Sequence, residues 1–248
     1  MMTSAALAYR ERFLELLFPP ACLACRGQLV GKQSARFCVD CLEELAIFRA
    51  PFCNGCGKAV PQPLEAGKSC GHCGLNKPRY DRALSLGPYD GLLRNLLLRA
   101  KRPAGEVAVR ILAQLLAEER CEQLEQSKID VVCPVPMYWR RRARRLANSA
   151  ESVAEILAQQ LRAPLASRLL SRRRHTKPQS SLPPTGRLEN VRRAFDLGAG
   201  HHLDGAHVLL VDDILTTGAT CNEAARILKR NGASQVTVAV VARSLSSR

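Results

Sequence analysis

The residues of this chain that could do chemistry gather in one segment near the C-terminus, residues 208–220. An apolar run, Val208–Val211, ends in two acids, Asp212 and Asp213, and a helical pattern begins at about Ala219. The start of a helix offers N–H groups without intrahelical partners and the positive end of the helix dipole, which suit a phosphate. The two acids would repel a phosphate. At the end of a parallel strand they suit sugar hydroxyls or a divalent ion.

The turn between the acids and the helix supplies further groups that can hold an anion. Thr216, Thr217 and Thr220 provide hydroxyl donors, and Gly218 lets the backbone approach a ligand closely before the helix starts at Ala219. Together with the acids, these residues predict a site for a ribose 5-phosphate. The simpler alternative is a strand, turn and helix that carry Asp and Thr only as caps. It is weakened because the paired acids and Thr-Thr-Gly-x-Thr occur together.

This segment resembles the phosphoribosyl pyrophosphate (PRPP) signature of type I phosphoribosyltransferases. The resemblance implies that Asp212 and Asp213, the candidate catalytic residues, hold the 2′- and 3′-hydroxyls of the ribose. It also implies that the loop Thr216–Thr220 holds the 5-phosphate. The chain has neither G-x-x-x-x-G-K-[ST] nor G-x-G-x-x-G. Readings as a nucleoside-triphosphate or dinucleotide site therefore lack support.

Four C-x-x-C pairs form a second group of candidate functional residues, which could bind metal ions. Eight of the 11 cysteines belong to it: Cys22, Cys25, Cys38, Cys41, Cys53, Cys56, Cys70 and Cys73. Each pair can fold as a knuckle that gives two thiolates to one tetrahedral ion, so we expect two structural Zn²⁺ ions. Sharing between consecutive pairs needs the shortest loops, although crossed pairing, a ligand role for His72, and iron in place of zinc remain alternatives.

A basic tract follows a predicted strand that ends in Pro134-Val135-Pro136. Residues 134–195 contain 14 Lys and Arg residues against three acids, and so carry most of the net charge of +15. In type I phosphoribosyltransferases the loop after this strand binds pyrophosphate, which implies that Arg140 and Arg141 bind the diphosphate of PRPP, with Arg142 beside them. The alternative is a solvated basic face or a general attraction for nucleic acid.

These groups need an α/β scaffold to position them. Residues 80–248 alternate apolar runs with helical patterns, which predicts a parallel sheet with flanking helices. The predicted strands cover residues 82–89, 129–134, 208–211 and 236–241. The predicted helices cover residues 92–100, 106–119, 146–161 and 219–230, and a further amphipathic helix covers residues 5–18. Residues 171–190 show no periodicity, which predicts a long loop that could close over the site as a lid.

Length, composition and charge narrow the class of protein. The chain has 248 residues, of which 46% are hydrophobic and 4% aromatic, so it can form a packed and mainly aliphatic core. Because the composition changes near residue 80, we divide the chain into a helix and double zinc ribbon at 1–79 and a second domain at 80–248. The net charge predicts polyanionic partners. With neither a signal peptide nor an apolar stretch of ~20 residues, we expect a cytoplasmic protein without membrane insertion.

The order of the motifs resembles the ComF family of bacteria, the competence-protein-F and GntX-like proteins, over nearly the full length. Lys101 lies between the cysteine knuckles and the arginine run, and further positions that match the family pattern are Thr176, Gln179, Arg187, Asn190 and Phe195. The resemblance implies a double zinc ribbon before a type I phosphoribosyltransferase-like domain. It also implies PRPP with Mg²⁺ as ligand, Lys101 among its contacts, and a link to DNA uptake, with single-stranded DNA and DNA-uptake proteins as partners.

Two functional hypotheses follow from these patterns. The first is an enzyme that transfers a phosphoribosyl group to an unidentified acceptor and releases pyrophosphate, which the intact Asp212-Asp213 pair and the Thr-Thr-Gly turn favour. The second is a non-catalytic protein that binds single-stranded DNA or senses PRPP, with the zinc ribbon as an interaction module. Residues 145–149 favour the second, because they read Arg-Leu-Ala-Asn-Ser where the family usually has Arg-Gly-Phe-Asn-Gln.

Overall fold

The computed structural model forms two compact units, Met1–Ala46 and Ile47–Arg248. It describes residues 21–29, 36–47, 51–65, 68, 70–71, 73, 78–102, 105–137, 148–174, 176 and 182–244. The predicted helix over residues 5–18 lies outside the described residues. Our division at residue 80 is drawn from sequence composition and remains a prediction. By contacts, the second cysteine cluster lies within the larger unit.

Within its described residues, 21–29 and 36–46, the smaller unit contains a cysteine knuckle and one short helix. The knuckle is closed by a 2.8 Å hydrogen bond from the Cys22 amide to the Gly27 carbonyl. Helix α2, Val39–Glu44, begins after the second cysteine pair's first member, Cys38, and buries Cys41. The knuckle and α2 thus place the four cysteines of this unit.

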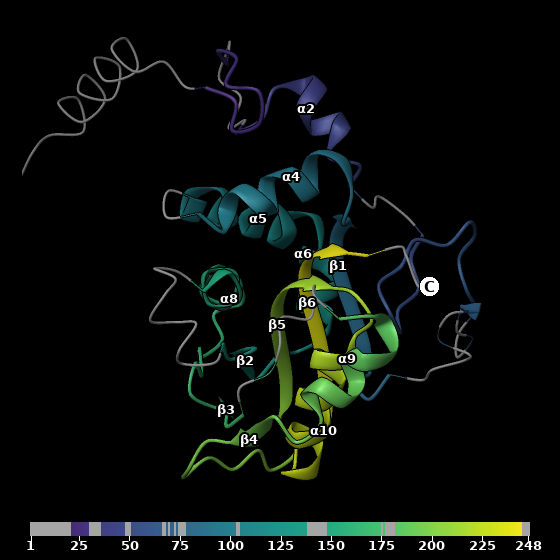
Figure 1. The fold of residues 1–248 in the computed structure, drawn as a ribbon, viewed down its shortest axis with the longest axis vertical. Helices are drawn as coiled ribbons and strands as arrows, with labels where there is room; N and C mark the ends of the chain where they lie inside the picture. The colour runs from purple at the N-terminus through teal and green to yellow at the C-terminus, as the bar shows by residue number, and fades with distance from the viewer. Residues whose placement is uncertain are drawn as a thin grey trace, which may run out of the picture. The chain divides into compact units, whose positions relative to one another are not determined.

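The larger unit is built on a four-stranded parallel sheet, as the alternation of apolar runs and helical patterns predicts. The strands lie in the order β1-β6-β5-β2 and span Arg82–Pro88, Gln235–Arg243, His207–Leu215 and Val131–Pro134 (Figure 1). All three strand pairs are parallel. The carboxyl ends of the strands therefore meet at one edge of the sheet, where open α/β sheets bind their ligands.

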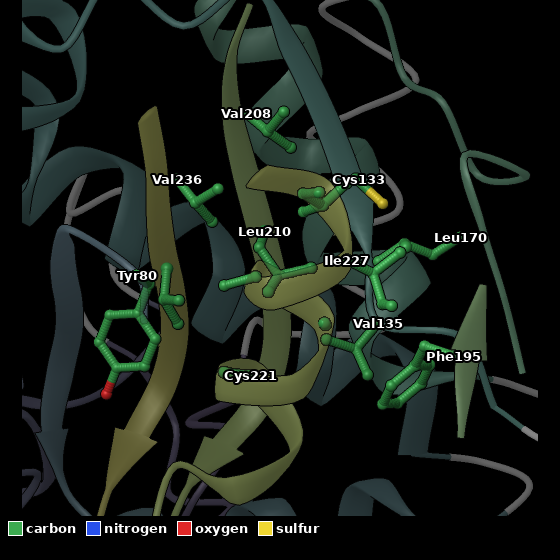
Figure 2. Packing of buried hydrophobic residues seen from close by; sticks show 14 of the residues in the cluster. Tyr80, Cys133, Val135, Leu170, Phe195, Val208, Leu210, Cys221, Ile227 and Val236 are labelled. Carbon is green, nitrogen blue, oxygen red and sulfur yellow. The ribbon is translucent and has the colours of Figure 1, made fainter. Parts of the chain in front are cut away.

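Helices contact both faces of this sheet. Those described in the larger unit are α4 (Gly91–Ala100), α5 (Glu106–Glu119), α6 (Cys121–Gln126), α8 (Ser149–Leu161), α9 (Pro184–Val191) and α10 (Ala219–Arg230). Figure 2 shows α10 packed on one face, where Cys221 and Ile227 lie near Leu210. Alternate strand residues such as Leu209 and Val211 are also fully buried. Because successive strand side chains point to opposite faces, Leu209 and Val211 lie on the other face. Helix α5 contacts β1 and β6, and α8 contacts β5 and β2.

A small second sheet corrects the prediction for residues 171–190. Strand β3, Leu170–Arg172, pairs antiparallel with β4, Phe195–Leu197. Helix α9 comes between the two strands in the sequence. The predicted loop is therefore partly structured. Helix α9 begins with a proline at its first position, which favours a helix start, but its eight residues are too few for a helical period to be visible in the sequence.

The helices of the described ranges are all too short or too polar to cross a bilayer.

Candidate functional site

The two acids of the predicted site lie at the carboxyl end of β5, next to a lysine from α4. Both Asp212 and Asp213 are half-buried. Lys101, which follows the last residue of α4, places its Nζ 3.8 Å from Oδ2 of Asp213. The fold thus brings together three of the predicted site residues, although Lys101 is far from the acids in sequence.

Asp212 holds a proton more strongly than an ordinary aspartate. Burial raises its pKa, and the adjacent Asp213 carboxylate raises it further. A 2.9 Å hydrogen bond from the Asp213 amide and the positive charge of Arg172 lower the pKa, and the result is a value of about 8. A position at the end of a strand predicts that both acids face solvent, but in the structure both side chains are only partly exposed. Near neutral pH the pair therefore carries less than two negative charges, a state suited to hydrogen bonds with hydroxyl groups.

The loop after β5 leads into the N-terminus of α10. Gly218 precedes the helix in the left-handed conformation, with φ of +79°. The hydroxyl of Thr217 accepts a hydrogen bond from the Ala219 amide at 3.4 Å. Thr216, Thr217 and Thr220 are all half-buried at this end of the helix. Hydroxyl groups and the first N–H groups of a 12-residue helix are thereby gathered at one place, which is the chemistry of a phosphate site.

A buried tyrosine limits the space around Gly218. A Cβ atom added at Gly218 would lie 3.3 Å from the hydroxyl oxygen of Tyr80. Figure 2 shows that Tyr80 directs this hydroxyl toward the carboxyl ends of the strands, and burial raises the pKa of the phenol, so it stays neutral. Glycine is thus required at this position both by its positive φ and by the close approach of Tyr80.

Arg243, which the sequence analysis did not identify, binds the main chain at the start of the loop Leu215–Thr220. Its side chain is almost fully buried at the end of β6. The guanidinium Nη1 donates to the carbonyl oxygens of Leu215, at 2.7 Å, and of Thr216, while Nε donates to the carbonyl oxygen of Cys56 at 2.8 Å. The only signal in the sequence is a charged residue that continues the apolar run of β6.

Arg172 on β3 is a second charged residue near the acids. Its guanidinium carbon lies 5.2 Å from the centre of the Phe195 ring and its Nη2 donates to the hydroxyl of Thr176. Its charge lowers the pKa of Asp212 against the effect of burial. The matched family positions Thr176 and Phe195 therefore hold an arginine whose field reaches the acidic pair.

Two neighbouring arginines of the basic tract are engaged in local contacts. Arg173 forms an ion pair with Asp196 at 2.5 Å while its side chain remains 73% exposed. Arg174 donates to the carbonyl oxygens of Asn190 and Arg192 at 3.1 and 2.8 Å. Arg173 keeps enough exposure to meet a polyanion, whereas Arg174 joins the segments that flank the small sheet.

The eight clustered cysteines form two sets of four, and the predicted sharing between consecutive pairs is confirmed. In each set the four Sγ atoms lie within 4.8 Å of one another. Measured Sγ–Sγ distances are 3.8 Å for Cys25 and Cys38, 3.9 Å for Cys53 and Cys73, and 3.6 Å for Cys56 and Cys70. A tetrahedral zinc ion with Zn–S bonds of about 2.3 Å separates its sulfur ligands by about 3.8 Å. Two Cys₄ sites of this size fit two structural zinc ions.

Both Cys₄ sites use the same backbone turn. The Gly57 amide donates to the Cys53 carbonyl at 2.8 Å, and at the matching position the Arg26 amide donates to the Cys22 carbonyl at 2.9 Å. The donor residue has a positive φ in each turn, +64° at Arg26 and +69° at Gly57. A full set of four thiolates leaves no ligand position for a substrate, so the role of each ion is to stabilise its knuckle.

Several predicted residues lie outside the described residues. These are Arg140, Arg141 and Arg142 of the basic tract, Gln179 of the family pattern, and His72 in the last knuckle. Their roles remain predictions from the sequence.

Comparison with known proteins finds both parts of this arrangement. Residues 146–248 match the family model described as phosphoribosyl transferase domain, and residues 13–74 match the double zinc ribbon domain. Competence protein F of Haemophilus influenzae is 31% identical over 228 residues, which are 90% of this chain and 96% of that protein. The DNA utilization protein YhgH of Escherichia coli is 30% identical, over 84% of this chain and 97% of its own length.

Two further matches are more distant. Competence protein ComFC of Bacillus subtilis is 27% identical over 84% of this chain and 83% of that protein. Among solved structures, a purine phosphoribosyltransferase from Pyrococcus horikoshii aligns with 66% of this chain and 82% of its own, at 19% identity and a TM-score of 0.35, a similarity too low to support an argument.

Proposed function

Because the chain belongs to the family of competence protein F and DNA utilization protein YhgH, we propose that its larger unit binds PRPP and transfers the phosphoribosyl group with release of pyrophosphate. The observation that carries this proposal is the arrangement at the carboxyl end of β5. There the acidic pair Asp212-Asp213 and Lys101 lie ahead of a threonine-rich loop whose left-handed Gly218 opens α10. Acids for hydroxyls and a helix start for phosphate match the two ends of a ribose 5-phosphate.

In this proposal, different residues bind the three parts of PRPP: the 5-phosphate, the ribose hydroxyls and the diphosphate. The backbone and hydroxyls of Thr216–Thr220 anchor the 5-phosphate. Asp212 and Asp213 accept hydrogen bonds from the 2′- and 3′-hydroxyls, and so fix the ring and its C1 atom. Lys101, with Arg140 and Arg141 of the basic tract, meets the diphosphate. As the acceptor's electron pair forms a bond to C1, the bond from C1 to the diphosphate oxygen breaks, and pyrophosphate leaves with the electron pair of the broken bond.

Catalysis in this scheme depends on positioning and charge stabilisation. Fixing C1 between the anchored phosphate and the acceptor replaces an encounter in solution, and cations facing the diphosphate stabilise the charge that it gains as it leaves. Asp212 and Asp213 act on the reacting sugar itself, which is why we propose them as the catalytic residues. The acceptor's own chemistry decides whether a proton must also be removed.

A magnesium ion would arrive with the diphosphate. Among the described residues, groups of three or more potential ligands occur only in the two cysteine clusters. The acidic pair offers carboxylate oxygens, which suit Mg²⁺ but do not make a complete cage, and Mg²⁺ in proteins is commonly held by one or two carboxylates together with substrate phosphates. When bound, the ion supplies charge neutralisation for the departing pyrophosphate.

Calorimetric titration with PRPP, with and without Mg²⁺, tests the proposal. We expect saturable binding that Asp212→Asn combined with Asp213→Asn abolishes, because the double variant removes both carboxyl groups and a lost charge-assisted hydrogen bond costs about 1.5–3 kcal/mol. Asp204→Asn, an exposed acid in the turn before β5, is the matched control and should bind as the wild type. Unchanged affinity in the double variant would refute the site. A pyrophosphate-release screen over candidate acceptors then tests transfer.

The relatives' names support a second candidate function. This chain aligns with nearly the full length of proteins named for competence and for DNA utilization. In the basic tract, the side chain of Arg173, which follows β3, is exposed. A non-catalytic protein that binds single-stranded DNA or senses PRPP through the same fold would account for both, with DNA-uptake proteins as further partners of the zinc ribbon. PRPP binding without pyrophosphate release by any acceptor would favour this alternative.

A further inference from the structure

The second Cys₄ knuckle is held firmly against the edge of the sheet. The carbonyl of Asn54 accepts a hydrogen bond from the Ala83 amide of β1 at 2.8 Å, and the carbonyl of Gly57 accepts one from the buried Ser85 hydroxyl at 2.9 Å. A Cβ at Gly57 would lie 3.2 Å from the Ala83 carbonyl oxygen, so the knuckle and the strand are in close contact. The knuckle therefore forms part of the larger unit's packing.

The buried Arg120 also contacts the start of this knuckle. The guanidinium carbon of Arg120 lies 5.0 Å from the centre of the Phe52 ring, next to the first cysteine of the knuckle. Its Nε donates to the carbonyl of Ser85 at 3.0 Å. Main-chain bonds and a stacked arginine thus fix the knuckle's position relative to β1.

Arg243 connects this knuckle with the loop proposed to bind phosphate. Its Nε donates to the carbonyl of Cys56, a cysteine of the second cluster, while Nη1 donates to the carbonyls of Leu215 and Thr216. The side chain is only 1% exposed. A buried guanidinium that loses an acceptor pays a desolvation penalty or moves to regain one, so the positions of its partners depend on one another.

The carbonyl of Cys56 is in place only while the knuckle is folded. Knuckles of this size fold when their thiolates bind a metal, and the binding free energy is their folding free energy. When the second site loses a ligand or its ion, the Cys56 carbonyl is released. The guanidinium then loses the acceptor of its Nε, one of the contacts that fix it beside the Leu215–Thr216 main chain.

We propose that Arg243 is a positioning residue through which the second Cys₄ site controls the conformation of the loop Leu215–Thr220. The first Cys₄ site, which lies in the smaller unit, has no part in this coupling. Anion binding at the loop consequently depends on one of the two metal sites. The identity of the anion rests on the function proposed above, whereas the dependence of the loop on Cys56 and Arg243 does not.

Hydrogen exchange on the full-length, zinc-loaded protein tests the coupling without reference to activity. We compare Cys70→Ser, which removes a ligand from the second site, with Cys25→Ser, which makes the same change at the first. Amides of residues 215–220 should exchange at least tenfold faster in Cys70→Ser and at the wild-type rate in Cys25→Ser, while the core of β5, residues 207–211, stays protected in both. Equal loop exchange in the two variants would overturn the proposal.

Arg243→Lys provides a second and independent comparison. Lysine keeps the positive charge but replaces a planar group that donates to the carbonyls of Cys56, Leu215, Thr216 and Ser244 with a single ammonium. We expect faster exchange of the loop while elemental analysis still finds two zinc ions per chain. Wild-type loop protection in Arg243→Lys would overturn the proposal, and this variant decides the matter if Cys70→Ser also exposes the β5 core.

PRPP titration of the same proteins separates this inference from the proposed function. If the wild type binds PRPP, its affinity should fall at least tenfold in Cys70→Ser and in Arg243→Lys but not in Cys25→Ser. If the wild type does not bind PRPP, the proposed function fails. The exchange measurements still decide whether the loop depends on the second site.

Discussion

The Nε atom of Arg243 lies 2.8 Å from the carbonyl oxygen of Cys56, across 187 positions of sequence. This contact joins β6 to the second cysteine knuckle. It is one of the contacts that place this knuckle in the larger unit, Ile47–Arg248, whereas the first cluster lies in the smaller unit, Met1–Ala46. Two metal sites with the same backbone turn thus have different surroundings, and a change in one of them need not affect the other.

The purified protein should contain two zinc ions per chain. Cys38→Ser removes one ligand of the first site, so we expect the zinc content to fall to about one per chain and the smaller unit to lose its structure. Elemental analysis and hydrogen exchange of residues 36–47 measure both effects. Protein with neither zinc nor iron at either site would contradict the assignment.

Asp212→Asn should stabilise the protein in the absence of ligand, and more so at higher pH. In the unfolded chain Asp212 titrates near its ordinary value of 3.8, whereas in the fold its pKa is about 8. Between these values the folded state keeps a proton that the unfolded state has lost, so this group lowers the free energy of unfolding progressively as the pH rises. Asparagine removes that effect and can still accept the bond from the Asp213 amide.

Thermal melting at several pH values checks this. We expect Tm to rise by about 2–4 °C at pH 8, the shift that corresponds to about 1 kcal/mol in a chain of this size, and to change little at pH 4. Asp204→Asn, the exposed control, should show no such dependence on pH. A variant that melts below the wild type at pH 8 would contradict the cause given for the raised pKa.

Gly218→Ala should destabilise the protein and weaken PRPP binding. Alanine in the left-handed conformation costs about 1 kcal/mol, and its Cβ would also press on the Tyr80 hydroxyl. Gly91→Ala is the control, because Gly91 also has a positive φ but has open space around its Cβ position. Denaturant unfolding should show a larger loss for Gly218→Ala. Equal losses would mean that the contact with Tyr80 has no cost.

Binding of single-stranded DNA, if present, should depend steeply on salt. The logarithm of affinity should fall against the logarithm of salt concentration by about 0.7 for each phosphate neutralised. Changing Arg172, Arg173 and Arg174 together would also disturb the contacts with Phe195 and Asn190. Arg173→Ala with Arg193→Ala is therefore the better variant, since both residues are exposed.

This double variant should lower the salt slope by about 1.4 if both residues contact phosphates, while PRPP binding stays nearly unchanged. Fluorescence anisotropy across a salt series measures the slope. A flat slope in the wild type would remove DNA binding from the account.

The local part of the site was predictable because its signals are local. The acids, the Thr-Thr-Gly turn and the helix that follows are consecutive in the chain, and β5 and α10 place them as the apolar run and the helical period predict. The four C-x-x-C pairs likewise predicted two Cys₄ sites, since the shortest loops join consecutive pairs. Helix α9 escaped prediction because eight residues are too short to display a period.

The sequence by itself determined the four strands of the parallel sheet, the helices α4, α5, α8 and α10, the residue types at the end of β5 and the grouping of the cysteines, because each is written in neighbouring residues or in a regular spacing. The tertiary structure alone decided that Lys101 meets Asp213, that Asp212 is partly enclosed, and that Arg243 joins the loop Leu215–Thr220 to Cys56. These features depend on burial and on contacts between segments far apart in the chain. They come into being only when the parallel sheet brings the carboxyl ends of its strands to one edge.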